Sequence, residues 1–321
     1  MQVGLITDSL GSRPLDEVLD ITAELSLDTV EIATGNWSES PHANLGELVS
    51  RKAARDELAG RIAARGLTLS ALNANGNSLH PVSGPAHDAC VRDSIRVASE
   101  MGVPTVVMMS GLPGARGEKS PNWITTSWPP ETLEILEYQW NEVAIPYWTE
   151  LAAFARRHDV RLAIEMHARQ LVFNPTTLRR LQDEVGDDVV GANLDPSHLM
   201  WMGADIPTVI RALGSSIFHV HAKDARVETH NLAVNGINDT LPPARSAERS
   251  WNYVTLGLGH PGGATFWADF VYGLKAVGYS GPLNIEHEDI VVGSLEGVRK
   301  SAELLRSVVL RDPADWTPAD I

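Results

Sequence analysis

The chain has 321 residues, of which 26 are Lys or Arg and 41 are Asp or Glu, so its formal net charge is −15 with histidine neutral. Nucleic-acid binding depends on basic side chains that neutralise phosphates, and no basic cluster occurs along the chain, so this composition argues against a nucleic-acid partner. Hydrophobic residues make up 43% of the chain, which is ordinary globular usage. The length allows either two average domains or one enlarged α/β barrel.

No targeting or membrane signal is evident in the sequence. Residues 1–8 lack the basic segment of a signal peptide, and no apolar run reaches the roughly 18 residues that a membrane helix needs. The single cysteine, Cys90, lies in a segment of helical character and cannot form an internal disulfide. We therefore expect a cytoplasmic protein with no membrane span, in which Cys90 is a packing residue.

Eight short runs rich in Val, Ile and Leu alternate with longer amphipathic segments, a pattern typical of a parallel sheet covered by helices. Helix start signals fall between them, such as Asn174 before Pro175 and Asp205 before Pro207. The sequence therefore predicts a single (β/α)8 TIM barrel that comprises residues 1–321. The predicted strands are 3–8, 29–33, 67–73, 105–110, 161–167, 190–195, 217–224 and 283–288.

Two predicted connections are long and irregular, at 111–130 after the fourth strand and at 225–263 after the seventh. Both follow the carboxyl ends of strands, where barrel enzymes build their active sites, so we expect them to act as lids. The alternatives are surface padding and contact with another subunit.

Polar residues recur on one face of each of the last four predicted strands. Strand alternation directs Glu165 and His167 into the barrel, while Ile164 and Met166 face the helices. The same alternation directs further polar residues inward: Asn193, Asp195, His219, His221, Lys223, Asn284, Glu286 and Glu288. Four adjacent strands thus aim carboxylates and imidazoles at one volume.

Carboxylates gathered in a cavity would repel one another and lose hydration, and a divalent cation removes both costs. Glu165, Asp195, His221 and Glu286 are the predicted ligands. Three carboxylates and one imidazole suit Mn²⁺, Mg²⁺ or Co²⁺ better than a structural zinc, although Zn²⁺ stays open. The alternative is a buried ion-pair network of these carboxylates with basic residues, namely Lys223, Arg169 and Arg226.

Four ordered motifs, Glu165-Met166-His167, Asn193 to Leu199, His219 to Asp224 and Ile285 to Asp289, resemble the xylose isomerase-like TIM barrels, particularly the sugar phosphate isomerase/epimerase family. The resemblance extends over essentially the whole chain. It implies one divalent metal ion, often manganese, held by the four predicted ligands, with His198 beside the metal or the substrate.

One departure concerns the ketose 3-epimerases of that family, in which a second glutamate follows the first ligand by six residues. This chain has Leu171 there. Together with the segment 73–81, the motif set is more similar to the larger subunit of bacterial C-glycoside deglycosidases. That resemblance implies cleavage of 3-oxo-glycosides, a small β-rich partner subunit and an oligomeric assembly.

The common chemistry of these candidates is removal of a proton α to a sugar carbonyl whose oxygen is polarised by the metal. We expect His167 and Glu286 as base and acid, followed by His198, because histidine titrates near neutral pH. The alternative is that His167 only orients Glu165 or binds the substrate. The proton returns in an epimerase or isomerase, whereas in a deglycosidase, or in a lyase or hydratase of O-linked 3-oxo-glycosides, the aglycone leaves by β-elimination.

Several other polar and aromatic residues are candidate contacts for the sugar or glycoside. They are Asn73, His80, Lys223, Arg249, Trp251 and His260. Asn73 and His80 flank an Asn-rich and Gly-containing segment that is equally suited to a turn. Lys223 with Asp224 can also be an ion-paired strand end.

Two other classes of protein compete with a sugar enzyme. An apurinic-site endonuclease of the same superfamily would need about three zinc ions and more histidine ligands. A non-catalytic binding subunit would have no need of an intact ligand set.

Overall fold

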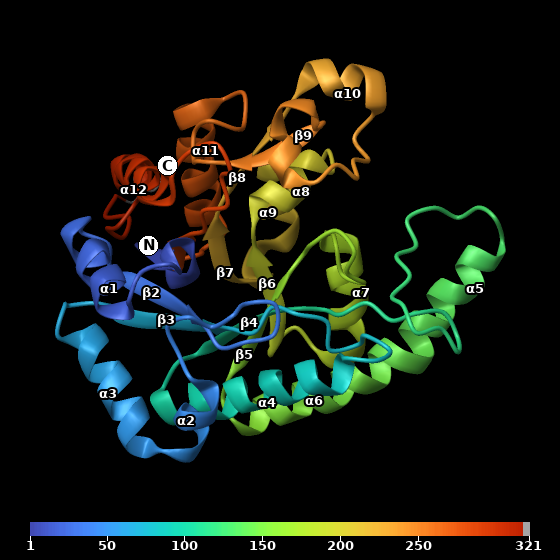
Figure 1. The fold of residues 1–321 in the computed structure, drawn as a ribbon, viewed down its shortest axis with the longest axis horizontal. Helices are drawn as coiled ribbons and strands as arrows, with labels where there is room; N and C mark the ends of the chain where they lie inside the picture. Colours follow the sequence, from blue (N-terminus) through green and yellow to red (C-terminus); the bar gives the residue numbers. More distant parts are fainter. Residues whose placement is uncertain (317–321) are drawn as a thin grey trace, which may run out of the picture.

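The computed structural model describes residues 1–316, which form an α/β barrel (Figure 1). Eight parallel strands close on themselves in the order β1-β10-β7-β6-β5-β4-β3-β2. The predicted TIM-barrel fold is therefore confirmed, whereas the predicted domain bounds, 1–321, include residues 317–321, which lie outside the described residues. Its strands are β1 Gln2–Ile6, β2 Thr29–Ala33, β3 Thr68–Asn73, β4 Thr105–Met109, β5 Arg161–Glu165, β6 Val190–Leu194, β7 Ile217–Ala222 and β10 Pro282–Ile285.

Helices follow each barrel strand and pack around the sheet (Figure 1). Outward strand residues such as Val30, Ile32, Leu162 and Ile164 are fully buried against them. The helices are α1 Leu15–Glu24, α2 Leu45–Ser50, α3 Lys52–Ala63, α4 Gly84–Met101, α5 Glu131–Tyr138, α6 Ile145–Arg157, α7 Pro175–Val185, α8 Pro196–Trp201, α9 Ile206–Leu213, α10 Thr229–Asn235, α11 Gly263–Ala276 and α12 Ser294–Val308. Short 3-10 turns occupy Thr7–Leu10, Gly214–Ser216 and Pro243–Glu248.

Side chains of modest size fill the middle of the barrel. Ala71, Val107, Ala163 and Phe218 form a small buried cluster there. A β-bulge in β7, where Asn193 pairs with His219 after Ala192 has paired with Ile217, inserts Phe218 into this interior. The apolar cluster closes the barrel below the polar residues, which therefore collect at its carboxyl end.

The two long connections differ from each other. Residues 111–130 contain no helix or strand, as predicted. The prediction that 225–263 is irregular is wrong, because it contains α10, a 3-10 segment and a hairpin whose strands β8 Asp224–Val227 and β9 Trp251–Val254 pair antiparallel. Short strands separated by more than twenty residues leave no local turn signal in the sequence.

A π-helical segment, Gln139–Ala144, joins α5 to α6 without a break. Gln139 is fully buried, and its side-chain amide donates to the carbonyl oxygens of Pro113 at 2.9 Å and Asn122 at 2.6 Å. The helix thereby fixes both ends of the central part of the 111–130 loop.

The helix start signals predicted from the sequence are present as helix caps in the structure. Asn174 caps α7 in a capping box with Thr177, and Asp205 caps α9. Cys90 lies half-buried in α4, with its thiol 3.8 Å from the carbonyl oxygen of Thr34. Within residues 1–316, no helix combines the length and apolar character needed to cross a membrane.

Candidate metal centre and active site

Four side chains from four adjacent strands meet at the carboxyl end of the barrel: Glu165, Asp195, His221 and Glu286. Glu165 is the last residue of β5 and His221 lies within β7, whereas Asp195 and Glu286 directly follow β6 and β10. One potential ligand atom from each residue lies within 4.8 Å of those of the other three. The structure thus brings together the four residues predicted as metal ligands.

Three of these residues present buried polar atoms that make no hydrogen bond within the described part of the chain: Asp195 Oδ2, His221 Nδ1 and Glu286 Oε2. The other oxygen of Asp195 accepts from the backbone N–H of Ser197 at 2.8 Å, where Asp195 caps α8. Their remaining close contacts are ion pairs, of His221 Nδ1 with Glu286 Oε2 and of Asp195 Oδ2 with His198 Nε2, both at 3.1 Å. Buried polar atoms are normally hydrogen-bonded, so the convergence of three such atoms fits a bound cation.

The opposite nitrogen of His221 is held by Glu31, a fully buried residue of β2. His221 Nε2 lies 2.9 Å from Glu31 Oε1, and His219 Nε2 lies 2.7 Å from Glu31 Oε2. The amides of Asn73 and Asn284 also donate to Glu31, at 2.8 and 2.9 Å. Metal-binding histidines commonly donate their second N–H to a carboxylate, and Glu31 occupies that position for His221.

Glu165 is oriented by a second group of polar side chains. Its Oε2 accepts from the amides of Asn75 at 2.9 Å and Asn193 at 3.2 Å. Its Oε1 lies 3.0 Å from His198 Nε2. His198 Nδ1 in turn lies 2.7 Å from the hydroxyl of Tyr253 on β9, so the hairpin after β7 reaches the site.

Lys223 balances part of the negative charge. Its Nζ lies 2.6 Å from Glu288, 3.4 Å from Glu286 and 3.7 Å from Asp195, and 4.4 Å from the centre of the Tyr253 ring. Of the three basic residues in the alternative ion-pair network, it is the one that reaches the carboxylates. Arg226 instead pairs with Glu228, and Arg169 forms no ion pair with any residue in 1–316.

Neighbouring groups separate the acidities of the site residues. Burial acts to raise the pKa of Glu165, but hydrogen bonds with His198 and His221 outweigh it and hold that pKa well below its usual value. Burial raises the pKa of Glu286 despite the nearby Lys223. Burial, assisted by repulsion from His198, lowers the pKa of His167 to about 4. The site therefore holds carboxylates of unlike acidity side by side.

The two candidate catalytic histidines have different surroundings. The rings of His167 and His198 meet edge to face, with their centres 4.1 Å apart. Both nitrogens of His198 are engaged, which suits a positioning role. His167 donates its Nδ1–H to the carbonyl oxygen of Ala168, so its Nε2 is the ring nitrogen left for proton exchange.

A cavity of about 360 Å³ opens onto the ligand cluster. Glu165, His167, His198, Lys223 and Glu286 line it, together with other residues that include Asn73, Asn75, Trp37 and Glu288. We call it the metal-side cavity. Its walls thus include the three candidate catalytic residues and two of the predicted substrate contacts, Asn73 and Lys223.

The other predicted substrate contacts lie elsewhere. His80 lines a neighbouring cavity. Trp251 stacks on Trp201, with ring centres 4.3 Å apart, and Arg249 lies over Trp251. His260 stacks on Phe266. Arg249, Trp251 and His260 are not among the residues that line the metal-side cavity.

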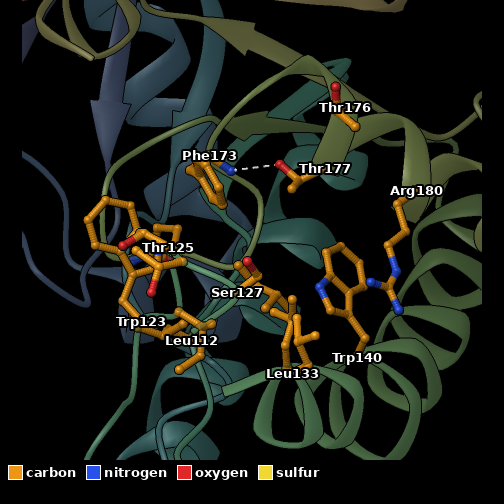
Figure 2. Close-up of a pocket in the computed structure, with 15 residues that line it drawn as sticks. Leu112, Trp123, Thr125, Ser127, Leu133, Trp140, Phe173, Thr176, Thr177 and Arg180 are labelled. Carbon is orange, nitrogen blue, oxygen red and sulfur yellow. Dashed lines mark hydrogen bonds between the residues drawn. The ribbon is translucent and has the colours of Figure 1, made fainter. Parts of the chain in front are cut away.

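Two further cavities adjoin this end of the barrel. The first, of about 330 Å³, shares Trp37 and His167 with the metal-side cavity, and we call it the second cavity. The other, of about 360 Å³, is apolar and lies between the 111–130 loop, α5 and α7 (Figure 2). There Trp123 meets Phe173 edge to face at 5.6 Å. None of the described residues lining this apolar cavity is a carboxylate or a histidine, so it cannot supply acid–base chemistry.

Two residues of the site, Glu31 and Tyr253, were not predicted from the sequence. Glu31 is the single charged residue of β2 and lies between the apolar Val30 and Ile32, which is a detectable signal. Tyr253 gives no comparable signal, because its approach to His198 depends on the β8–β9 hairpin.

The fold and this cluster define an α/β barrel with a candidate metal centre at the carboxyl ends of its strands. The family description "Xylose isomerase-like TIM barrel" matches residues 19–308, and the chain belongs to that family. It is 44% identical over 314 residues to the uncharacterised protein YfiH of Bacillus subtilis (strain 168), covering 96% of this chain and 99% of the relative.

Solved structures show the same fold at low identity. An L-ribulose 3-epimerase matches with a TM-score of 0.63 at 17% identity, covering 96% of this chain and 94% of that one. The probable 3-DHS dehydratase AsbF from Bacillus anthracis matches with a TM-score of 0.66 at 14% identity, covering 95% and 99%. The IOLI protein with a bound zinc atom matches with a TM-score of 0.64 at 20% identity, covering 96% and 98%.

Proposed function

We propose that the protein is a divalent-metal-dependent enzyme that removes a proton α to the carbonyl of a keto sugar. The observation that carries this proposal is the convergence of Asp195 Oδ2, His221 Nδ1 and Glu286 Oε2, none of which makes a regular hydrogen bond within residues 1–316, beside Glu165 and a cavity lined by His167. The neighbouring folds include a sugar epimerase, a dehydratase and a zinc-binding protein, which is in keeping with this chemistry. Mn²⁺ is our preferred cation, because oxygen ligands predominate.

The chain's own residues account for the proton transfers. A divalent cation held by the four ligands would polarise a sugar carbonyl or hydroxyl oxygen as a Lewis acid. We assign His167 Nε2, the ring nitrogen not held by Ala168, as the acceptor of the proton from the carbon next to the carbonyl. The C–H electron pair becomes the new C=C bond, and the π pair of the carbonyl moves onto its oxygen. Glu286 faces the same cavity and is the candidate for returning or donating a proton. Lys223 and His198 hold the carboxylates in position.

We further propose that the reaction ends in β-elimination from a 3-oxo-glycoside, as in a C-glycoside deglycosidase. The carbonyl then re-forms, and the enolate electron pair makes a C=C bond to the carbon that bears the aglycone. The bond to the aglycone breaks with its electron pair, and the aglycone takes up a proton from Glu286. Two observations favour this over epimerisation of a free ketose. The second cavity gives room for another group beyond His167. Leu171, at the place of the second glutamate of the 3-epimerases, is buried in the core and offers no polar contact to a sugar.

The first test is metal dependence. We expect about one divalent ion per chain, and a fall in kcat/KM of about a thousandfold in Glu165→Gln or Asp195→Asn, because the bound ion contributes several kcal/mol to the transition state. Glu24→Gln, an exposed change on α1, is the matched control. A purified protein that binds no metal and gains no activity with Mn²⁺, Co²⁺ or Mg²⁺ would contradict the proposal.

The second test separates cleavage from epimerisation. A 3-oxo-C-glucoside and a free ketose are each followed by NMR in D₂O. Release of the aglycone from the first compound supports elimination, whereas deuterium entry into the second without cleavage supports an epimerase. The β-rich partner subunit, the oligomeric assembly and the cytoplasmic location stay predictions.

A further inference from the structure

The second cavity has an unusual set of lining side chains for so acidic a protein. Although 41 residues of the chain are Asp or Glu, no carboxylate occurs among the described residues that line it. His80, His87 and Arg169 line it instead, with Asn77 and Ser83. Groups that donate hydrogen bonds therefore dominate its polar wall.

Backbone contacts fix which nitrogen of each histidine is the donor. His80 Nδ1 accepts from the backbone N–H groups of Val82 and Ser83, both at 3.1 Å, and His87 Nδ1 accepts from that of Asn77 at 2.9 Å. In a neutral imidazole the proton must then lie on Nε2. Neither Nε2 makes a hydrogen bond to any residue in 1–316. Two N–H donors are thus left for a ligand.

The chain is shaped around these groups. Gly76 has no space for a side chain, because a Cβ atom would lie 2.5 Å from His87 Nδ1 and 2.8 Å from Asn36 Cβ. Arg169, an exposed residue that makes no ion pair with the described residues, adds a positive charge at the rim of the cavity and has a left-handed backbone with φ of 61°. Non-glycine residues seldom adopt this conformation, and it is found here two residues after His167.

We propose that the second cavity binds an oxygen anion, a carboxylate or an ionised phenol, through His80, His87 and Arg169. Two neutral N–H donors and one guanidinium are complementary to such a group, whereas a neutral apolar group would leave them unpaired. Trp37 and His167 border both cavities, so one ligand can occupy the two at once. Its sugar then lies in the metal-side cavity, and the group joined to the sugar lies in the second cavity and carries the anion. Assigning the anion to the substrate rests on the proposed function, but its binding does not.

Binding of small anions tests the site directly. Benzoate, ionised 4-nitrophenol and neutral benzamide are titrated into the metal-loaded protein by calorimetry. We expect one or both anions to bind and benzamide to bind at least tenfold more weakly, the difference of one charge-assisted hydrogen bond. Which anion binds more tightly distinguishes a carboxylic from a phenolic substrate.

Two variants remove the donors while preserving the fold. Arg169→Asn suits a left-handed backbone, and His80→Asn keeps an acceptor near the position of Nδ1 while it removes the Nε2–H group. Each is expected to weaken binding of the preferred anion about tenfold. Arg306→Asn, on α12, is the matched control and should bind as the wild type does. Unchanged anion affinity in both test variants would overturn the inference.

Glu165→Gln distinguishes this site from the metal centre. It should abolish turnover but leave anion affinity within about twofold of the wild type. A loss of anion binding in Glu165→Gln with no loss in Arg169→Asn would place the anion on the metal and contradict the inference. A crystal soaked with 4-bromobenzoate provides an independent check, because the bromine marks the ring in the second cavity and the carboxylate at its other end must then lie against His80, His87 and Arg169.

Discussion

At the scale of single residues, Glu31 determines how His221 is presented to the other ligands. Its carboxylate holds His221 Nε2, which turns Nδ1 toward Glu165 and Glu286 at 3.3 and 3.1 Å. His219, Asn73 and Asn284 hold Glu31 itself. A residue outside the set of candidate ligands therefore fixes the orientation of one of its members.

Glu31→Gln is predicted to weaken binding of the divalent cation about 10- to 100-fold, because the His221 imidazole loses its carboxylate partner. The affinity is measured by competition with a metal chelator at fixed pH. Glu24→Gln, on the exposed face of α1, serves as the control and should leave the affinity unchanged. Equal affinities in both variants would show that Glu31 does not act through His221.

At the scale of elements, the hairpin of β8 and β9 is joined to the site through Tyr253. Its hydroxyl holds His198, and its ring lies against Lys223. His198 contacts both Glu165 and Asp195, at 3.0 and 3.1 Å. An insertion between the seventh and eighth barrel strands thus contributes directly to the order of the ligand cluster.

Tyr253→Phe is predicted to lower the free energy of unfolding by about 1–3 kcal/mol, because it leaves a buried nitrogen of His198 without its partner. Urea denaturation measures the change. Tyr272→Phe removes a hydroxyl from a residue that is 70% exposed and should be nearly neutral. If the two variants unfold at the same urea concentration, the Tyr253 contact does not stabilise the fold.

The barrel strands could be predicted from the sequence, whereas the β8–β9 hairpin inserted between β7 and β10 could not. All eight barrel strands fall within two or three residues of their predicted bounds, because apolar alternation is a local property. The predicted strands extend too far at their carboxyl ends: Asp195 and Glu286 follow the strands that were expected to contain them. The chain leaves the strand conformation just before Asp195 and Glu286, which lets their side chains turn toward the cavity.

The remaining features depend on contacts between distant parts of the chain. Glu31 meets His219 and His221, which are 188 and 190 residues away. Tyr253 meets His198 across 55 residues. Pattern within a short window cannot reveal such pairs. The proximity of Glu165, Asp195, His221 and Glu286 was easier to predict, because they lie at the carboxyl ends of adjacent strands.

At the scale of the whole molecule, the carboxyl end of the barrel concentrates negative charge. Five carboxylates, Glu31, Glu165, Asp195, Glu286 and Glu288, lie around one lysine and three histidines. Their mutual repulsion opposes closure of the barrel unless protons or a cation offset it. Binding of the proposed cation would therefore stabilise the entire fold.

Removal of divalent metal with a chelator is predicted to lower Tm by about 5 °C relative to protein with Mn²⁺ at about a hundredfold above its Kd, a stabilisation of about 2.7 kcal/mol. Differential scanning calorimetry measures both states. Glu165→Gln should show little change on chelation, which controls for effects of the chelator. Identical Tm values for the wild type with and without metal would argue against a bound ion at this centre.

The π-helical segment between α5 and α6 has a consequence for how the protein can diverge. A π turn contains one residue more than an α turn, so deletion of a single residue within Gln139–Ala144 would restore a regular α-helix. The preceding helix α5 would then turn by about 100° relative to α6. Gln139 would lose its hydrogen bonds to the carbonyl oxygens of Pro113 and Asn122. These bonds hold the 111–130 loop, whose Pro121 borders the second cavity. Deletion of one codon can therefore change the shape of that cavity without altering any barrel strand or any candidate metal ligand.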